Sequence, residues 1–305
     1  MNIVFMGTPD FAVPSLEALA ADSRFTVKAV YTQPDKPVGR KRVLTPPDVK
    51  VCAEKLGLEV RQPESMRSPE VAQEISDLAP DVIVVIAYGK ILPKEILDIP
   101  RLCCVNIHGS LLPKLRGAAP IQRAVIEGEE ITGITSMRMD VGLDTGDMIE
   151  TLETKICPDE TAGELFDRLA QAAPDLLVKT LISLESGTAK FTKQDDSAST
   201  YAKPLSKEEA QIDWSQSAQT VHNKIRGMNP WPVAFTEYKG KKLKVFESNL
   251  SPQTGKPGEI LSTSPAVIAC GEGAVELVSV QMEGKKQMPA ADFFRGQRAV
   301  KGELI

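Results

Sequence analysis

The sequence predicts an α/β protein, in which a Rossmann-like, mostly parallel sheet with helices on both faces is followed by a small C-terminal OB-like β-barrel domain. Three observations lead to this fold class. Short apolar runs alternate with helix-like stretches over the first half of the chain, a small polar segment follows at residues 194–200, and short segments rich in β-branched residues fill the last third. The length of 305 residues also favours two domains over one.

The first half of the chain alternates between two kinds of segment. Apolar runs that predict buried strands lie at residues 3–6, 27–31, 82–87 and 104–107. Helix-like stretches lie at 14–21, 49–56, 69–78 and 118–127. The run after Asp81 is the clearest strand, because a parallel sheet covered on both faces requires apolar residues without alternation.

The middle of the chain sets the expected domain boundary. Two strand-like segments over residues 133–154 are joined by a glycine-containing loop at 140–147, and a long helix is predicted from 161 to 185. The small polar segment that follows has the composition of a linker. We therefore predict a first domain over 1–189, a linker over 190–206 and a second domain over 207–305.

The last third predicts one helix and then a barrel. The helix spans residues 217–226. Five short strand-like segments follow, at 233–238, 243–248, 259–261, 266–270 and 275–280. Turn residues such as Lys239-Gly240 separate them, and five short strands are typical of an OB-like barrel.

Composition limits the class of protein. The net charge of -5 argues against binding nucleic acid over the whole surface, although residues 201–305 hold 14 basic against 11 acidic side chains. No window has the roughly 18 apolar residues of a membrane helix, and the first residues lack a basic signal region. The five cysteines have neither disulfide nor zinc spacing. We expect a cytoplasmic monomer that neither associates with a membrane nor binds a metal ion.

The residues with the strongest chemical signal stand at the end of a predicted strand. Asn106 and His108 alternate along an extended segment, so their side chains share one face, and ligands of open α/β sheets bind beyond the carboxyl ends of strands. An asparagine amide can donate to a developing oxyanion, and histidine transfers protons near neutral pH. Asp144, in a glycine-flanked loop, is the leading carboxylate to orient the imidazole.

Taken alone, these residues also allow less specific roles. A histidine after a strand is more often structural, and Asp144 could be only a turn residue. His222, on a predicted helix beside Asn223 and Lys224, is expected on the solvated surface. The turn at 7–10 lacks the full dinucleotide-binding fingerprint, which disfavours a nicotinamide-dependent dehydrogenase.

Several ordered stretches resemble the methionyl-tRNA formyltransferases, a folate-dependent family, over essentially the whole chain. They are Met6–Phe11, Thr32–Pro37, Ala87–Pro93, Asn106–Pro113, Arg116–Gln122, Met139–Asp147, Ile212–Trp214 and Asn229–Pro232. The resemblance implies that 10-formyltetrahydrofolate is the co-substrate, that methionyl-initiator tRNA is the acceptor, and that the first domain is catalytic while the second contacts tRNA.

The resemblance also assigns roles to residues. It implies that Asn106, His108 and Asp144 are catalytic. The residues implied in folate binding are Lys90, Leu92, Ser110, Leu111, Leu112, Pro113 and Asp140. Those implied in tRNA binding are Lys36, Arg40, Lys41 and Arg42, in a loop that offers four cations to phosphates.

Two alternatives remain open at this point. One is a folate-dependent formyltransferase that acts on a small amine, such as a nucleotide-linked amino sugar or glycinamide ribonucleotide. The basic loop and the last third favour a macromolecular substrate instead. The other is a catalytically idle α/β domain fused to a nucleic-acid-binding barrel, against which the intact Asn106, His108 and Asp144 count.

Overall fold

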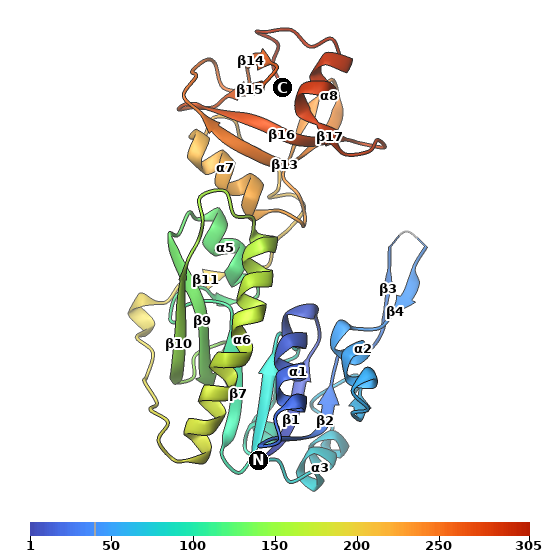
Figure 1. Ribbon diagram of the computed structural model, residues 1–305, viewed down its shortest axis with the longest axis vertical. Helices are drawn as coiled ribbons and strands as arrows, with labels where there is room; N and C mark the ends of the chain where they lie inside the picture. Colours follow the sequence, from blue (N-terminus) through green and yellow to red (C-terminus); the bar gives the residue numbers. More distant parts are fainter. Residues whose placement is uncertain (40) are drawn as a thin grey trace. The chain divides into compact units, whose positions relative to one another are not determined.

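The computed structural model describes residues 1–39 and 41–305, and the chain divides into two compact units (Figure 1). Unit 1 consists of Met1–Gly117, Gly133–Thr154 and Phe166–Tyr201. Unit 2 consists of Ala118–Thr132, Lys155–Leu165 and Ala202–Ile305. The units are therefore interleaved in sequence, and the domain limits 1–189 and 207–305 stay a prediction.

Unit 1 is built on a seven-stranded sheet in the order β10-β9-β7-β6-β1-β2-β5. The strands are β1 (Asn2–Gly7), β2 (Thr26–Tyr31), β5 (Val60–Arg61), β6 (Val82–Ile86), β7 (Cys103–His108), β9 (Ile131–Arg138) and β10 (Met148–Lys155). The pairs from β5 to β7 are parallel, whereas β9 runs antiparallel to β7. This arrangement confirms the mostly parallel sheet.

Helices cover both faces of this sheet. They are α1 (Val13–Ala21), α2 (Asp48–Lys55), α3 (Pro69–Asp77), α4 (Lys94–Leu97) and most of α6 (Ala162–Glu185), with short 3-10 turns at Asp10–Ala12 and Asp196–Ala198. Val4 of β1 packs in one cluster with Ile75 of α3, and Ile3 and Phe5, which point the other way, are fully buried as well. Every residue of β6 is buried for the same reason.

Unit 2 is built on an antiparallel sheet in the order β12-β13-β16-β15-β14, with β17 paired to β16. The strands are β12 (Phe235–Tyr238), β13 (Lys241–Ser251), β14 (Ile260–Thr263), β15 (Ala266–Ala269), β16 (Ala274–Met282) and β17 (Met288–Pro289). Its helices are α5 (Pro120–Ile126), α7 (Ala218–Gly227) and α8 (Ala290–Gly296). The curled sheet confirms the OB-like prediction, although sequence periodicity did not reveal α8, whose Phe293 and Phe294 pack edge-on against Tyr238.

Two features differ from the sequence-based expectation. The basic loop contains a hairpin of β3 (Lys36–Val38) and β4 (Val43–Thr45). His222 is not on the solvated surface, because its ring lies inside unit 2 with 2% exposure.

Two further short strands, β8 (Arg116–Gly117) and β11 (Tyr201–Ala202), pair with each other. No helix among the described residues is long and apolar enough to cross a membrane.

Candidate active site

Asn106 and His108 lie on one face of β7, as alternation along the strand requires. They stand opposite Met137 and Thr135 of the antiparallel strand β9, and the ring of His108 is 5% exposed. The Asn106 amide is half-buried and makes no hydrogen bond to any residue that the structure describes. An amide donor and an imidazole therefore share one face at the end of a central strand.

The protein fixes the orientation of the His108 ring. Nε2 lies 2.8 Å from the carbonyl oxygen of Leu115, and because a carbonyl can only accept, Nε2 carries a hydrogen. Nδ1 lies 3.7 Å from Oδ2 of Asp144, which is ion-pair distance but too long for a hydrogen bond. Within the described residues, Nδ1 is therefore the ring nitrogen without a hydrogen-bond partner.

Asp144 reaches this position through an unusual backbone conformation. Its φ is +53°, in the left-handed region that aspartate tolerates better than most residues. Its Oδ2 accepts a 2.8 Å hydrogen bond from the backbone N–H of Gly117. Asp140 closes the loop, since its Oδ1 accepts from Gly142 N at 2.9 Å and from Thr145 Oγ1 at 2.7 Å. The structure thus brings Asp144 beside His108, which spacing alone could not establish.

Sequence reasoning missed the backbone groups that hold this pair. The carbonyl of Leu115, whose own φ is +58°, holds the imidazole, and the N–H of Gly117 holds the carboxylate. Both belong to one short segment that lies between His108 and Asp144 in sequence. A main-chain contact leaves no side-chain signal in a single sequence, so nothing in the residue types could have revealed it.

The segment after His108, predicted to border folate, is partly committed to internal contacts. The Ser110 hydroxyl, 1% exposed, donates to Lys114 O at 2.7 Å. Leu112 is also buried, and its N–H donates to Thr135 Oγ1 at 3.1 Å. Leu111 and Pro113 remain half-buried. The carbonyl of Ser110 accepts from Thr135 Oγ1 at 2.7 Å, so both the hydroxyl and the carbonyl of Ser110 have protein partners.

The other predicted folate residues lie on two segments with exposed apolar side chains. Lys90 donates to the carbonyls of Pro63 and Glu64, and Leu92 is buried in the core. Ile91 between them is 76% exposed. Asp140 is exposed at the start of its loop. Burial, with help from nearby Lys36, lowers the pKa of Lys90.

Comparison with known proteins identifies the family. Residues 1–181 match the formyl transferase family model, and residues 204–298 match the model of the formyl transferase C-terminal domain. The chain is 50% identical to a methionyl-tRNA formyltransferase of Macrococcus caseolyticus, over 98% of this chain and 96% of the relative. It is 48% identical to one of Acetivibrio thermocellus, over 100% and 99%. The chain belongs to the methionyl-tRNA formyltransferase family.

Two solved structures share the fold at low sequence identity. An N-formyltransferase from Helicobacter canadensis, in complex with folinic acid and dTDP-3-aminofucose, aligns with a TM-score of 0.67 at 18% identity, over 94% of this chain and 99% of that one. HypX from Aquifex aeolicus in complex with tetrahydrofolic acid aligns with a TM-score of 0.64 at 19% identity, over 99% of this chain and 48% of that one. These likenesses show the fold alone.

In this formyl transferase, the basic hairpin is anchored to the segment that carries Lys90. Gln33, just before the hairpin, donates from Nε2 to Tyr88 O at 3.0 Å. Gly89 has a φ of +76°, and a Cβ there would lie 2.2 Å from Gln33 Nε2, so the two segments are in close contact. Lys50 pairs with Asp35 at 3.0 Å.

The predicted tRNA-binding residues are placed only in part. Lys36, Lys41 and Arg42 are exposed on or beside the hairpin. Arg40 lies outside the described residues. Leu44, on the second strand of the hairpin, is 64% exposed. The hairpin thus presents cations together with apolar surface.

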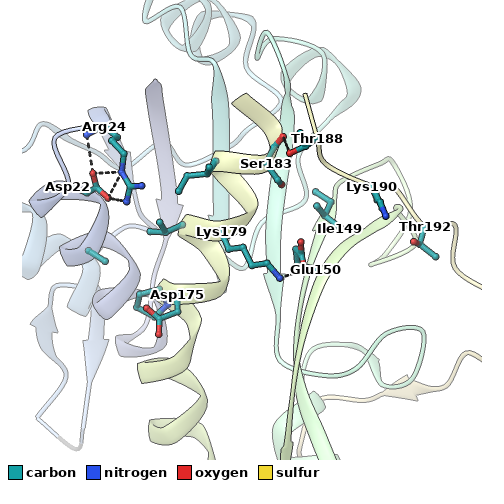
Figure 2. A pocket seen from close by; sticks show the side chains of 14 residues that line it. Asp22, Arg24, Ile149, Glu150, Asp175, Lys179, Ser183, Thr188, Lys190 and Thr192 are labelled. Atoms are coloured by element: carbon teal, nitrogen blue, oxygen red, sulfur yellow. Dashed lines mark hydrogen bonds and ion pairs between the residues drawn. The ribbon is translucent and has the colours of Figure 1, made fainter. Parts of the chain in front are cut away.

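A groove elsewhere in unit 1 does not contain the predicted site residues (Figure 2). It has a volume of about 1000 Å³ and is lined by residues of α1, β10, α6 and the segment 188–192. Its charged side chains include two ion pairs, Arg24 with Asp22 and Lys179 with Glu150. This groove and the cluster at the end of β7 are therefore separate features of unit 1.

The cysteines near the site are unsuited to nucleophilic chemistry. Burial raises the pKa of Cys103 to about 11, and it also raises the pKa of Cys104. Both thiols therefore stay protonated near neutral pH. Among the described residues, no group of three or more His, Cys, Asp or Glu side chains is arranged to hold a metal ion.

Proposed function

We propose that the protein transfers the formyl group of 10-formyltetrahydrofolate to the α-amino group of methionyl-initiator tRNA, giving formylmethionyl-tRNA and tetrahydrofolate. The observation that carries this proposal is the cluster at the end of β7, where Asn106 and His108 share a face and Asp144 lies 3.7 Å from His108. The high identity to methionyl-tRNA formyltransferases over the whole chain supports the acceptor.

The reaction begins with attack by the neutral amine on the formyl carbon. A free α-amino group titrates at about 7.7–8.0, so a usable fraction is neutral at cellular pH. The new N–C bond places a negative charge on the former carbonyl oxygen. The unpartnered amide of Asn106 donates to that oxyanion, and protonated His108 stabilises it electrostatically.

Collapse of the intermediate breaks the bond between the formyl carbon and the folate nitrogen. That nitrogen leaves with a proton from His108, and the proton that the attacking amine loses returns to His108, directly or through water, so the overall transfer is proton-neutral. We assign the proton delivery to Nδ1 of His108, directly or through water, because Nε2 already donates to Leu115. Asp144 sustains the imidazolium charge. These steps require no metal.

The two substrates have separate binding regions in this proposal. Folate binds the segment with Lys90 and Leu92, the stretch Ser110–Pro113 and the loop of Asp140. Three exposed apolar side chains of these segments are available to a pterin ring: Ile91 (76%), Val141 (73%) and Leu143 (54%). The cations of the hairpin contact tRNA phosphates. We further propose a cytoplasmic monomer.

The test is transfer of labelled formyl from 10-formyltetrahydrofolate to charged initiator tRNA, with wild type compared with His108→Ala. Glycinamide ribonucleotide and an amino-sugar nucleotide serve as rival acceptors. We expect product on methionyl-tRNA alone, and loss of that product in the variant. Product only on a small amine would assign the enzyme to another acceptor class, and no product on any acceptor would refute formyl transfer.

A further inference from the structure

We infer that the segment Lys193–Thr200 is part of the active site, and that Gln194 is a positioning residue for Asp144. Its small polar composition is that of a linker, yet it is hydrogen-bonded to both protein segments that hold the catalytic pair. The inference rests on the proposed function for its kinetic consequence, while the geometry stands independently of that function.

Gln194 is buried against the loop of Asp144, with 4% exposure. Its Nε2 donates to the carbonyl oxygens of Asp144 and Gly146, each at 2.8 Å. Its Oε1 accepts from Arg116 Nε at 2.9 Å. Both amide hydrogens and the amide oxygen of Gln194 are therefore hydrogen-bonded. Two of the three bonds reach the loop of Asp144, and the third reaches Arg116, next to Leu115.

Thr200, at the other end of the segment, is hydrogen-bonded to Leu115, and Leu115 is in turn hydrogen-bonded to His108. Its Oγ1 accepts from Leu115 N at 2.8 Å, and its carbonyl accepts from Arg116 N at 2.9 Å. The Leu115 carbonyl in turn accepts from His108 Nε2. Between these two points, Asp196 pairs with Arg116 Nη2 at 2.8 Å. The segment thus fixes the protein contacts of both His108 and Asp144.

Gln194 adds to the hydrogen bonds that Asp140 makes within the loop of Asp144, because it holds the backbone at Asp144 itself. A non-glycine residue at φ +53° is in a sparsely populated conformation, and Gly142 and Gly146 flank it. Val141 and Leu143 are largely exposed and add little packing. Since a misplacement of about 1 Å can cost roughly 100-fold in rate, the two bonds from Gln194 to this loop matter for catalysis.

The kinetic test compares Gln194→Met with Gln171→Met, a matched change at an exposed glutamine on α6. Methionine preserves the length of the side chain and removes all three hydrogen bonds. We expect kcat of Gln194→Met to fall roughly 10- to 100-fold, with KM for the folate donor changed much less. We expect Gln171→Met to match wild type. A kcat for Gln194→Met within about twofold of wild type would overturn the inference.

A second pair of variants guards against simple misfolding. Thr200 is exposed, so Thr200→Val keeps its shape and removes only the acceptor for Leu115 N. Thr200→Ser keeps that acceptor. We expect a lower kcat in Thr200→Val and recovery in Thr200→Ser. Equal rates in the two variants would contradict the role of this end of the segment.

A spectroscopic test does not depend on activity. The chain contains only two histidines, His108 and His222, and His222 belongs to unit 2. In NMR spectra of the imidazole rings, we expect Gln194→Met to move the His108 signals as Asp144→Asn does, and to leave those of His222 in place. Unchanged His108 signals, or equal changes in both rings, would overturn the inference. If wild type transfers no formyl group, the proposed function fails and these spectra still decide the positioning role.

Discussion

The charge of Asp144 offers the sharpest test of the proposed mechanism. We choose Asp144→Asn, because asparagine is nearly isosteric and tolerates the φ of +53° at this position. The amide oxygen can still accept from the N–H of Gly117, which now bonds Oδ2 at 2.8 Å. The substitution therefore removes the negative charge beside His108 and leaves most of the loop geometry in place.

The expected loss follows from the separation of the two groups. The distance from His108 Nδ1 to Asp144 Oδ2 is 3.7 Å, and the side chains are 6% and 17% exposed. Coulomb's law with an effective dielectric constant of roughly 20 gives about 4 kcal/mol for two unit charges at this separation. The hydration that the carboxylate loses on burial offsets part of this energy, so we expect the substitution to raise the activation free energy by about 2–4 kcal/mol. That range corresponds to roughly a 30- to 1000-fold lower kcat.

The assay is formyl transfer to methionyl-tRNA under saturating donor, with the apparent KM for each substrate measured separately. Asp175→Asn, at an exposed aspartate of α6, is the matched control and should behave as wild type. The loss should appear in kcat, because the imidazolium charge is needed most when the oxyanion forms. A decrease of less than about threefold would refute the view that Asp144 supports a charged His108.

The other predictions concern the hairpin and unit 2. Combined Lys41→Ala and Arg42→Ala should raise KM for tRNA but not for folate, and should lower the slope of log affinity against log salt by about 2 in filter binding. Burial lowers the pKa of His222 below its ordinary 6.5, so the unfolded chain binds more protons than the folded chain as the pH falls through that value, and folding stability is lost there. The free energy of unfolding in urea should therefore fall between about pH 7.5 and about pH 5.5. That decrease should be smaller in His222→Gln than in wild type. Arg226, 6% exposed, donates to Cys157 O at 3.3 Å and Glu160 O at 3.1 Å, and Arg226→Met should lower the free energy of unfolding by about 2–4 kcal/mol in the same assay.

The first sheet was predictable because its central strands are buried on both faces. The run that became β6 has no polar residue, and such a run between helix-like stretches has few other structures available. The two-residue strand β5 and the hairpin strands β3 and β4 escaped prediction because they are too short to show a period. Helix α8 was missed because only seven residues carry its pattern.

The site was predictable only where it depends on local geometry. Alternation along a strand placed Asn106 and His108 on one face without any knowledge of the rest of the fold. The proximity of Asp144 depends on the loop between β9 and β10, and the role inferred for Gln194 depends on a segment 50 residues further along the chain. Sequence spacing carries no information on such contacts when a single sequence is considered.

The two histidines show what distinguishes a reactive imidazole from a structural one. Both are buried, and each has a carboxylate within 4 Å, since His222 Nε2 lies 3.3 Å from Asp159. Burial and a charged neighbour therefore do not separate them. His222 is hydrogen-bonded through both nitrogens, with Nδ1 3.0 Å from Ser248 Oγ and Nε2 3.2 Å from Pro158 O. His108 is held through Nε2 only, and within the described residues its Nδ1 has an acidic neighbour but no hydrogen bond. A ring that is fixed by one nitrogen and unsatisfied at the other can exchange a proton with a substrate, and that difference supports the role proposed for His108.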